Sequence, residues 1–277
     1  MPCNGTTLRY FWLIPPLILL CTGLGCGKSG LPLESLPRAT ATLYGYWRER
    51  DQLLDDTQEW HSSALIVEER KGALLLVTNS HCLDLRSLAR ADLFTDDVPE
   101  VAEYRITIRI GGVEAYADVI AETPEPIDVA LVAVRLSKLG SADYLIAPVT
   151  DCSQLKVGTK VAAVGSPLDP EAFEGTITFG YVSAIRNENS PCPVIQHDAP
   201  LNPGNSGGPL FAQLDPEKDE WYCVGVNFAK ATEGEGIGLA WALRPALRYE
   251  YEFAPCSPQG AVDLIRSIYG RRATVVP

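Results

Sequence analysis

Hydrophobic and polar positions alternate or cluster over short distances in most of the chain, which is typical of β-strands. Residues 64–67 and 73–77 are apolar and are joined by a charged tip, so they predict a hairpin of two mostly buried strands. In residues 104–110 every second side chain is hydrophobic, which predicts a strand with one buried face. Gly111 and Gly112 then predict a turn into a strand over residues 113–121. Further short apolar runs predict strands at residues 128–134, 161–164, 176–185, 193–196, 208–212, 222–228 and 237–242.

These many short strands, without a sustained helical period between them, predict an all-β sandwich or barrel. Three segments do not follow the strand pattern. Residues 84–103 are acidic and irregular, which predicts an inserted surface loop. Apolar side chains at helical spacing in residues 261–269, followed by Gly270, predict a short C-terminal helix. Residues 27–40 are rich in Gly, Pro and Ser and predict a flexible tether.

Residues 1–26 have the pattern of an export signal. Arg9 is followed by an uncharged apolar stretch at residues 11–25, which is too short to span a bilayer and is typical of a secretory signal peptide. Cys26 and the glycines around it resemble a bacterial lipobox, whose cysteine is lipidated. Gly23 stands where that motif usually has Leu, so cleavage without lipidation is the alternative. We expect an exported protein of the periplasm or cell envelope, anchored in the membrane if Cys26 carries lipid.

Composition and charge restrict the partners of the chain. Hydrophobic residues make up 46% of it, which excludes a mostly disordered protein. The formal net charge of -12 argues against nucleic acid as a partner, because an acidic surface repels phosphate. The eight cysteines and three histidines do not cluster at metal-ligand spacing, so the sequence predicts no metal site and no cofactor.

The segment NPGNSGGPL, at residues 202–210, carries the strongest chemical signal. Glycines on both sides of Ser206 leave its hydroxyl uncrowded and allow a sharply bent backbone. Such a backbone can aim two N–H groups at one point, where acyl transfer places negative charge on the former carbonyl oxygen. The segment therefore predicts a nucleophilic serine beside an oxyanion hole.

A serine hydroxyl needs a general base, and the chain offers only three histidines. His81 follows a buried strand, whose end is a rigid mount for a base. His61 lies in a polar connection. His197 precedes the segment that contains Ser206 and is the rival base. Asp128 begins a buried apolar strand, where an unpaired acid is costly, so we expect it to pair with an imidazole. Asp198 is the competing acid.

The segments TNSHC (78–82), IDVALVAV (127–134) and NPGNSGGPL (202–210) resemble the three active-site motifs of trypsin-like serine peptidases. The segments VGSPL (164–168), TITFGYVSAI (176–185), VGVN (224–227) and GIGLA (236–240) are similar to the bacterial HtrA/Deg branch of that family. The resemblance implies two six-stranded antiparallel β-barrels with the active site in the cleft between them. The implied order is an N-terminal barrel at 41–138, a C-terminal barrel at 139–250 and a C-terminal tail at 251–277.

By position, the resemblance makes Ser206 the nucleophile, His81 the general base and Asp128 the group that orients the imidazole. The N–H groups of Gly204 and Ser206, with Asn205 between them, form the implied oxyanion hole. Residues 224–229 are implied to pair with the substrate backbone as an added β-strand. The implied substrate-binding residues are Pro200, Val226, Asn227, Phe228 and Leu239.

The chain also departs from the family pattern. Ser62-Ser63-Ala64 stands where the HtrA/Deg branch usually has Gly-Ser-Gly, and we expect no PDZ module after the peptidase motifs. Pro200, six residues before Ser206, is the position expected near the base of the first specificity pocket. Because no acid stands there, we expect cleavage after small or medium aliphatic residues and not after Lys or Arg.

The sequence therefore predicts an exported serine endopeptidase that hydrolyses protein or peptide substrates through an acyl-enzyme, with a role in envelope protein quality control. The alternative is a catalytically silent trypsin-like protein that acts as a binding or scaffold module. An esterase with the same three residues is a more distant alternative.

Overall fold

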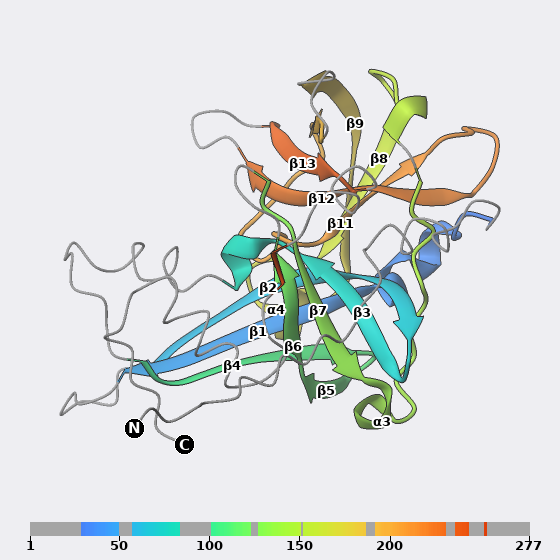
Figure 1. Cartoon of the computed structure of the whole chain (residues 1–277). Helices are drawn as coiled ribbons and strands as arrows, with labels where there is room; N and C mark the ends of the chain where they lie inside the picture. Colours follow the sequence, from blue (N-terminus) through green and yellow to red (C-terminus); the bar gives the residue numbers. More distant parts are fainter. Residues whose placement is uncertain are drawn as a thin grey trace, which may run out of the picture.

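The computed structural model describes residues 29–49, 57–83, 101–122, 127–150, 152–186, 192–230, 236–243 and 252–253. These residues form mostly β-strands in two sheets that lie against each other (Figure 1). The N-terminal sheet has eight strands, and the C-terminal sheet is a closed barrel of six. The all-β prediction is confirmed, and the N-terminal sheet differs from the implied six-stranded barrel in its number of strands.

The N-terminal sheet has the strand order β14-β6-β7-β3-β2-β1-β4-β5, and every neighbouring pair is antiparallel. Its strands are β1 (Thr40–Glu49), β2 (Thr57–Arg70), β3 (Ala73–Thr78), β4 (Val101–Ile110), β5 (Val113–Tyr116), β6 (Asp118–Glu122), β7 (Ala130–Arg135) and β14 (Glu252–Phe253). The hydrophobic face predicted for residues 104–110 packs into the core, where Ile106, Ile108 and Ile110 are buried.

The predicted hairpin at residues 64–77 is the β2–β3 pair, in register from Leu65 opposite Val77 to Arg70 opposite Ala73. Its turn, Lys71-Gly72, has positive φ at both residues, a conformation that glycine adopts without strain. Gly111 and Gly112 form the corresponding turn between β4 and β5, again with positive φ. Both predicted turns therefore lie where the chain reverses.

The C-terminal barrel closes in the order β10-β13-β12-β11-β8-β9. Its strands are β8 (Lys160–Gly165), β9 (Thr176–Arg186), β10 (Val194–His197), β11 (Pro209–Gln213), β12 (Trp221–Lys230) and β13 (Gly238–Ala242). Alternate residues point inward, and the barrel interior is filled by a fully or nearly fully buried set that includes Val161, Val182, Ile195, Leu210, Val224 and Ala240.

A third hydrophobic cluster joins the two sheets. It contains Leu65 and Val77 from the N-terminal sheet together with Val164, Phe211 and Val226 from the barrel. The shared core fixes the two sheets against each other, so side chains from both can meet in a defined geometry. The short helices are η1 (Leu33–Ala39), η2 (Ser80–Cys82), α3 (Leu136–Leu139), η3 (Cys152–Gln154) and α4 (Pro170–Phe173).

The prediction of a flexible tether at residues 27–40 is wrong for its described part. Residues Leu33–Ala39 form the 3₁₀ helix η1, and Leu36 and Ala39 are fully buried in the shared core. Leu31 also pairs with Trp221 as an isolated β-bridge. Burial of these apolar side chains outweighs the loop-forming tendency of the surrounding Gly, Pro and Ser residues.

Other segments also differ from the sequence predictions. The inserted loop predicted at 84–103 ends earlier, because β4 already begins at Val101; residues 84–100 lie outside the described part. Within the predicted C-terminal tail, β14 pairs with β6 at the edge of the N-terminal sheet. The predicted helix at 261–269 and the signal at 1–26, with Cys26, lie outside the described residues.

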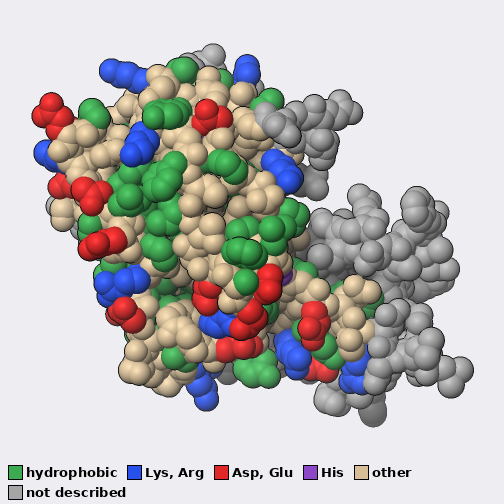
Figure 2. Space-filling view, turned by 180° about the vertical axis from the view of Figure 1, so that it is seen from behind, with side chains coloured by type: hydrophobic (Ala, Val, Ile, Leu, Met, Phe, Trp, Pro, Cys, Tyr) green, Lys and Arg blue, Asp and Glu red, His purple; other side chains and the backbone are tan. Residues whose placement is uncertain are grey.

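The face shown in Figure 2 carries acidic and basic side chains interspersed, with hydrophobic side chains gathered mainly on one half of it. The exposed large hydrophobic side chains of the molecule include Phe179 and Tyr181 on β9. In the part of the chain that the structure describes, no helix combines the length and the apolar character needed to cross a bilayer.

Candidate active site

His81 and Asp128 are brought together by two neighbouring strands. Strands β3 and β7 pair antiparallel up to Thr78 opposite Ala130. His81 lies three residues after Thr78, in η2, and Asp128 lies two residues before Ala130. Because paired antiparallel strands end side by side, the residue that follows one strand meets the residue that precedes the other.

Both oxygens of the Asp128 carboxylate accept hydrogen bonds from His81. The backbone N–H of His81 donates to Oδ1 at 2.9 Å, and the ring Nδ1–H donates to Oδ2 at 2.6 Å. The Asn79 side chain donates to the Asp128 carbonyl at 2.7 Å and fixes the same turn. These bonds set both the ring orientation and the tautomer, because a proton on Nδ1 leaves Nε2 with a lone pair.

The environment of His81 changes its pKa. Burial alone lowers the pKa, but the hydrogen bond to Asp128 and the neighbouring thiol of Cys82 raise it by more. The net direction is upward from the usual 6.5, because the carboxylate favours the charged imidazolium. The side chains remain partly exposed, 37% for His81 and 24% for Asp128, so the pair is accessible from solvent.

Ser206 lies on the loop of residues 198–208 between β10 and β11, which we call the serine loop. This loop is attached to the N-terminal sheet. The carbonyl of Ser206 accepts a hydrogen bond from the N–H of Ser63 on β2 at 2.8 Å. The carbonyl of Ser63 in turn accepts one from Thr78 Oγ1 at the end of β3, three residues before His81. The serine loop of the barrel is therefore connected to the strand end that carries the histidine.

Two glycines of the serine loop are required by the backbone geometry. Gly204 and Gly207 have φ of +96° and +80°, in the region that strongly favours glycine. A Cβ at Gly207 would collide with the carbonyl oxygen of Ser63 and with Thr78 Oγ1. Gly207 N–H donates to the Asn227 carbonyl at 2.8 Å, which ties the loop to β12.

The predicted oxyanion donors are the backbone N–H groups of Gly204 and Ser206. Among the described residues, no acceptor is bonded to the N–H of Gly204 or of Ser206. The N–H of the intervening Asn205 donates instead to Asn202, at 3.0 Å. Two available donors separated by one residue are what an oxyanion hole requires.

The three histidines differ in their surroundings and in their hydrogen-bond partners. His197 is fully buried, and its Nε2 bonds to the Asn227 side chain at 3.1 Å; burial lowers its pKa to about 4. The rival acid Asp198 accepts from the Tyr181 N–H instead of a histidine. His61 lies beneath the serine loop, where a Cβ on Gly204 would stand 2.6 Å from its Nε2. Of the three described histidines, only His81 is bonded to a carboxylate.

The predicted substrate-binding residues divide into two groups. Pro200 is exposed, and Phe228 and Leu239 are partly exposed. In contrast, the side chains of Val226 and Asn227 are buried, and the prediction that these two residues bind substrate stays a prediction. Asn227 is occupied inside the protein, because its amide group donates to the carbonyls of Gly208 and Pro209.

The backbone edge that is open to a substrate is shorter than the predicted range of residues 224–229. Residues up to Val226 are paired on both sides within the barrel, with β11 and β13. Asn227 then exchanges backbone hydrogen bonds with the serine loop. Among the described residues, no strand pairs with Phe228–Lys230 on the side of β11, so only these residues retain a backbone edge there. Phe228 stacks on Trp241 with 4.9 Å between ring centroids.

Several residues that hold the serine loop were not predicted as site residues. Ser63, Thr78 and Ser166 are buried and hydrogen-bonded around Gly204 and Ser206. In the sequence, the segment Ser62-Ser63-Ala64 differs from the family pattern and carries no signal of this supporting role. The described residues contain no group of His, Cys, Asp and Glu side chains that could hold a metal ion.

This geometry defines a class of site: a serine on a glycine-rich loop, two free N–H donors beside it, and a histidine–aspartate pair on an adjoining strand end. A family model described as "Trypsin-like peptidase domain" matches residues 62–216, which include all three residues. The chain belongs to the trypsin-like peptidase family.

Individual relatives belong to the HtrA/DegP group of serine proteases. The chain is 30% identical over 198 residues to the serine protease Do-like HtrA of Bacillus subtilis, covering 67% of this chain and 37% of that protein. It is 43% identical over 115 residues to a probable periplasmic serine endoprotease DegP-like of Pseudomonas fluorescens, covering 40% and 22%. It is 28% identical over 202 residues to the putative serine protease HhoA of Synechocystis, covering 70% and 47%. The chain thus spans less than half the length of each of these relatives.

Proposed function

We propose that the chain is a serine endopeptidase that hydrolyses peptide bonds through Ser206, His81 and Asp128. The observation that carries this proposal is the double hydrogen bond from His81 to Asp128. It holds the imidazole as the Nδ1–H tautomer, which leaves Nε2 as the base. The attachment of the Ser206 carbonyl to β2, next to the strand that leads to His81, supports the same assignment.

In the proposed mechanism, His81 Nε2 accepts the hydroxyl proton of Ser206 while Ser206 Oγ attacks the peptide carbonyl carbon. The carbonyl oxygen becomes an oxyanion that accepts hydrogen bonds from the N–H groups of Gly204 and Ser206. The imidazolium then gives its proton to the leaving amine, which forms the acyl-enzyme. Water attacks this ester with His81 again as the base, and Asp128 stabilises the imidazolium in both halves.

We propose that the substrate binds as an added β-strand along Phe228–Lys230, whose backbone edge on the side of the serine loop is not paired with β11. Pro200, Phe228 and Leu239 give the neighbouring surface an apolar character, so we propose cleavage after small or medium aliphatic residues. A peptide library profiled by mass spectrometry tests this preference. Preferred cleavage after Arg or Lys would contradict it.

We also propose that the protein is exported and acts on envelope proteins. The support is the signal-like segment at residues 1–26 and the similarity to relatives that are named probable periplasmic serine endoproteases. Lipidation of Cys26 is a separate proposal, and metabolic labelling with a radioactive fatty acid tests it. The label is expected on the wild-type protein and not on Cys26→Ser.

The direct test of the activity is hydrolysis of an unfolded protein substrate by the purified protein. We expect fragments with the wild type and with Ser183→Ala, which changes an exposed serine on β9, and none with Ser206→Ala. A folded wild-type protein that cleaves neither this substrate nor a peptide library would overturn the proposal. It would favour a binding module instead.

A further inference from the structure

Three successive backbone carbonyls of the serine loop each accept a hydrogen bond. The carbonyl of Pro203 accepts from the Leu168 N–H at 2.8 Å, and the carbonyl of Asn205 accepts from the Gly208 N–H at 3.0 Å. Between them, the Gly204 carbonyl accepts from the Ser63 hydroxyl at 2.7 Å. In a trans peptide the N–H points opposite to the C=O. The bonds to the Pro203 and Asn205 carbonyls therefore fix the directions of the Gly204 and Ser206 N–H groups, and the bond from Ser63 fixes the Gly204–Asn205 peptide that joins these two peptides.

Ser63 belongs to the N-terminal sheet and is fully buried at the junction with the barrel. Its hydroxyl donates to Gly204 and accepts from the Ser166 N–H at 3.0 Å. A hydroxyl with one donor and one acceptor bond of this kind has a single defined orientation. A Cβ on Gly165 would lie 2.7 Å from this hydroxyl oxygen, which shows how closely β8 approaches it.

The second external support, Leu168, lies on the loop between β8 and β9. Leu168 has a φ of +61°, an unfavourable conformation for a leucine, and its side chain is exposed. The strain persists only if the loop is held from elsewhere. Its bond to Pro203 thus depends on what anchors residues 166–175.

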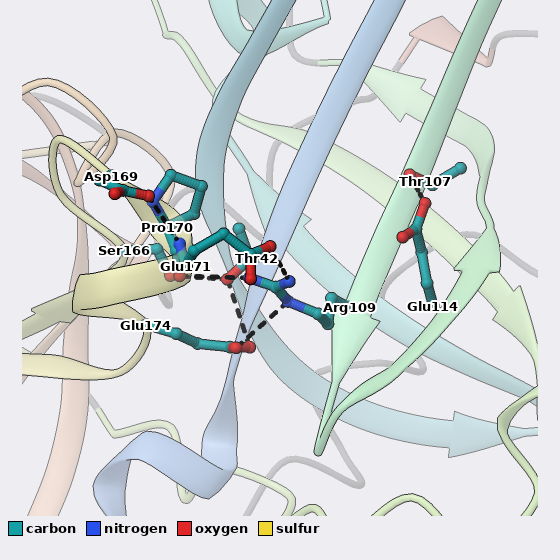
Figure 3. Close-up of polar contacts among 9 residues, drawn as sticks. All are labelled: Thr42, Thr107, Arg109, Glu114, Ser166, Asp169, Pro170, Glu171 and Glu174. Carbon is teal, nitrogen blue, oxygen red and sulfur yellow. Dashed lines mark hydrogen bonds and ion pairs between the residues drawn. The ribbon is translucent and has the colours of Figure 1, made fainter.

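The anchors of this loop come from the N-terminal sheet, as Figure 3 shows. Arg109 on β4 extends across to α4, where Nη1 pairs with Glu171 at 2.6 Å, Nε pairs with Glu174 at 3.2 Å and Nη2 donates to the Pro170 carbonyl at 3.2 Å. Thr42 on β1 meets Ser166 through their hydroxyl oxygens at 2.6 Å. The Arg109 side chain is only 16% exposed, so its contacts are less screened than those of a surface pair.

We propose that Ser63 and Arg109 are positioning residues for the oxyanion hole. Ser63 acts by holding the Gly204–Asn205 peptide between the two donors, and Arg109 acts through the loop that carries Leu168 to the Pro203 carbonyl. Neither residue touches the reacting atoms. The proposal rests on the proposed peptidase function, and it assigns to the N-terminal sheet a second task beside holding His81 and Asp128.

The expected signature is a loss in kcat with little change in KM. The oxyanion exists only in the transition state and in the tetrahedral intermediate, so misplaced donors weaken those states and not the bound substrate. We expect kcat to fall about 10- to 100-fold for Ser63→Ala and about 10-fold for Arg109→Gln. The pH midpoint of kcat is expected to stay at the wild-type value, because neither change touches the His81–Asp128 pair.

Matched controls lie close by on the same strands. Ser62→Ala removes a buried hydroxyl next to Ser63 that has no hydrogen-bond partner in the described structure. Arg105→Gln removes an arginine of β4 that pairs with Glu103 and stacks over Tyr46, away from the β8–β9 loop. Both controls are expected to retain wild-type kcat and KM.

The experiment measures kcat, KM and their pH dependence for the full chain with one peptide substrate, and checks folding of each variant by circular dichroism and thermal unfolding. If Ser63→Ala does not fold, Arg109→Gln carries the test, because the Arg109 side chain is partly exposed whereas Ser63 is fully buried. Wild-type rates in both Ser63→Ala and Arg109→Gln overturn the inference, as does a loss that appears in KM or shifts the pH midpoint. An inactive wild type would instead overturn the proposed function, so the two failures are distinct.

Discussion

In the N-terminal sheet, His81 and Asp128 are oriented mainly by side-chain hydrogen bonds between the ends of β3 and β7. In the C-terminal barrel, Ser206 lies on a loop whose position depends on backbone carbonyls and N–H groups, several of them bonded to the other sheet. A side-chain pair is broken by removing one functional group, whereas a loop held by several backbone hydrogen bonds loses only part of its support with one group and is disturbed most by added volume or strain. The two regions should therefore fail under different kinds of substitution.

The largest effect is expected for removing the proposed base or the proposed nucleophile. His81→Ala and Ser206→Ala should each lower kcat by about 10⁶-fold, since the two groups act as a unit in proton transfer and attack. Peptide hydrolysis by the purified variants, with thermal unfolding to confirm the fold, measures this. A His81→Ala variant that retained a tenth of the wild-type rate would show that another group is the base.

Asp128→Asn tests the side-chain pair without changing its shape. We expect kcat to fall by about 10⁴-fold, because the amide stabilises neither the required tautomer nor the imidazolium. The pH dependence of the rate tests the same pair, through the pKa of His81. His81 works only when neutral, and its raised pKa places the rising limb of the wild-type rate above pH 6.5.

Removing the carboxylate removes a group that favours the charged imidazole, so the limb should move to lower pH in Asp128→Asn. The pH dependence of kcat/KM for both proteins measures the shift. A limb that moved to higher pH, or a wild-type rate flat from pH 5 to 8, would contradict the assignment of His81.

Gly207→Ala tests the backbone-held region. The added methyl group meets the Ser63 carbonyl and Thr78 Oγ1 in a positive-φ conformation, so we expect a fall in kcat of about 100-fold and a lower unfolding temperature. Gly112→Ala is the matched control, because Gly112 has a similar φ of +78° but open space around it, in a turn of the other sheet. Equal kcat in the two variants would contradict the claim that the contacts of Gly207 position the serine loop.

The smallest effect concerns stability and not catalysis. Burial holds the pKa of His197 at about 4, whereas the unfolded chain takes up this proton near pH 6.5. The stability linked to neutral His197 is therefore complete above pH 6.5 and is lost as the pH falls toward 4, by about 3 kcal/mol in all. Urea unfolding at pH 7.5 and 4.5 should show a larger acid loss for the wild type than for His197→Gln. An identical acid loss in both proteins would contradict this account.

Most strands could be predicted from the sequence, because alternating hydrophobic positions and glycine turns are local signals, as in residues 104–112. It missed β1, where Thr, Tyr and Gly45 interrupt the hydrophobic pattern; Gly45 is required because Trp60 on β2 packs against it. The tether predicted at residues 27–40 was also wrong in its described part, since nothing local shows that Leu36 inserts between two sheets that form later in the chain. Such contacts depend on the tertiary fold.

At the site, the ends of apolar strands pointed to His81 and Asp128, and the glycine pattern pointed to Ser206. The buried roles of Val226 and Asn227 could not be foreseen, because they depend on β12 being paired on both sides and on His197 lying opposite Asn227. Ser63 was equally hidden, since its four hydrogen bonds reach residues that are distant along the chain.

The most direct test of the central claim is labelling of the folded protein with a fluorophosphonate, followed by peptide mapping. The account predicts one labelled residue, Ser206, and loss of labelling in both His81→Ala and Ser206→Ala, since an activated serine and a formed oxyanion hole are both needed. Absence of labelling in the folded wild type, or labelling that persists in His81→Ala at the wild-type rate, would contradict it.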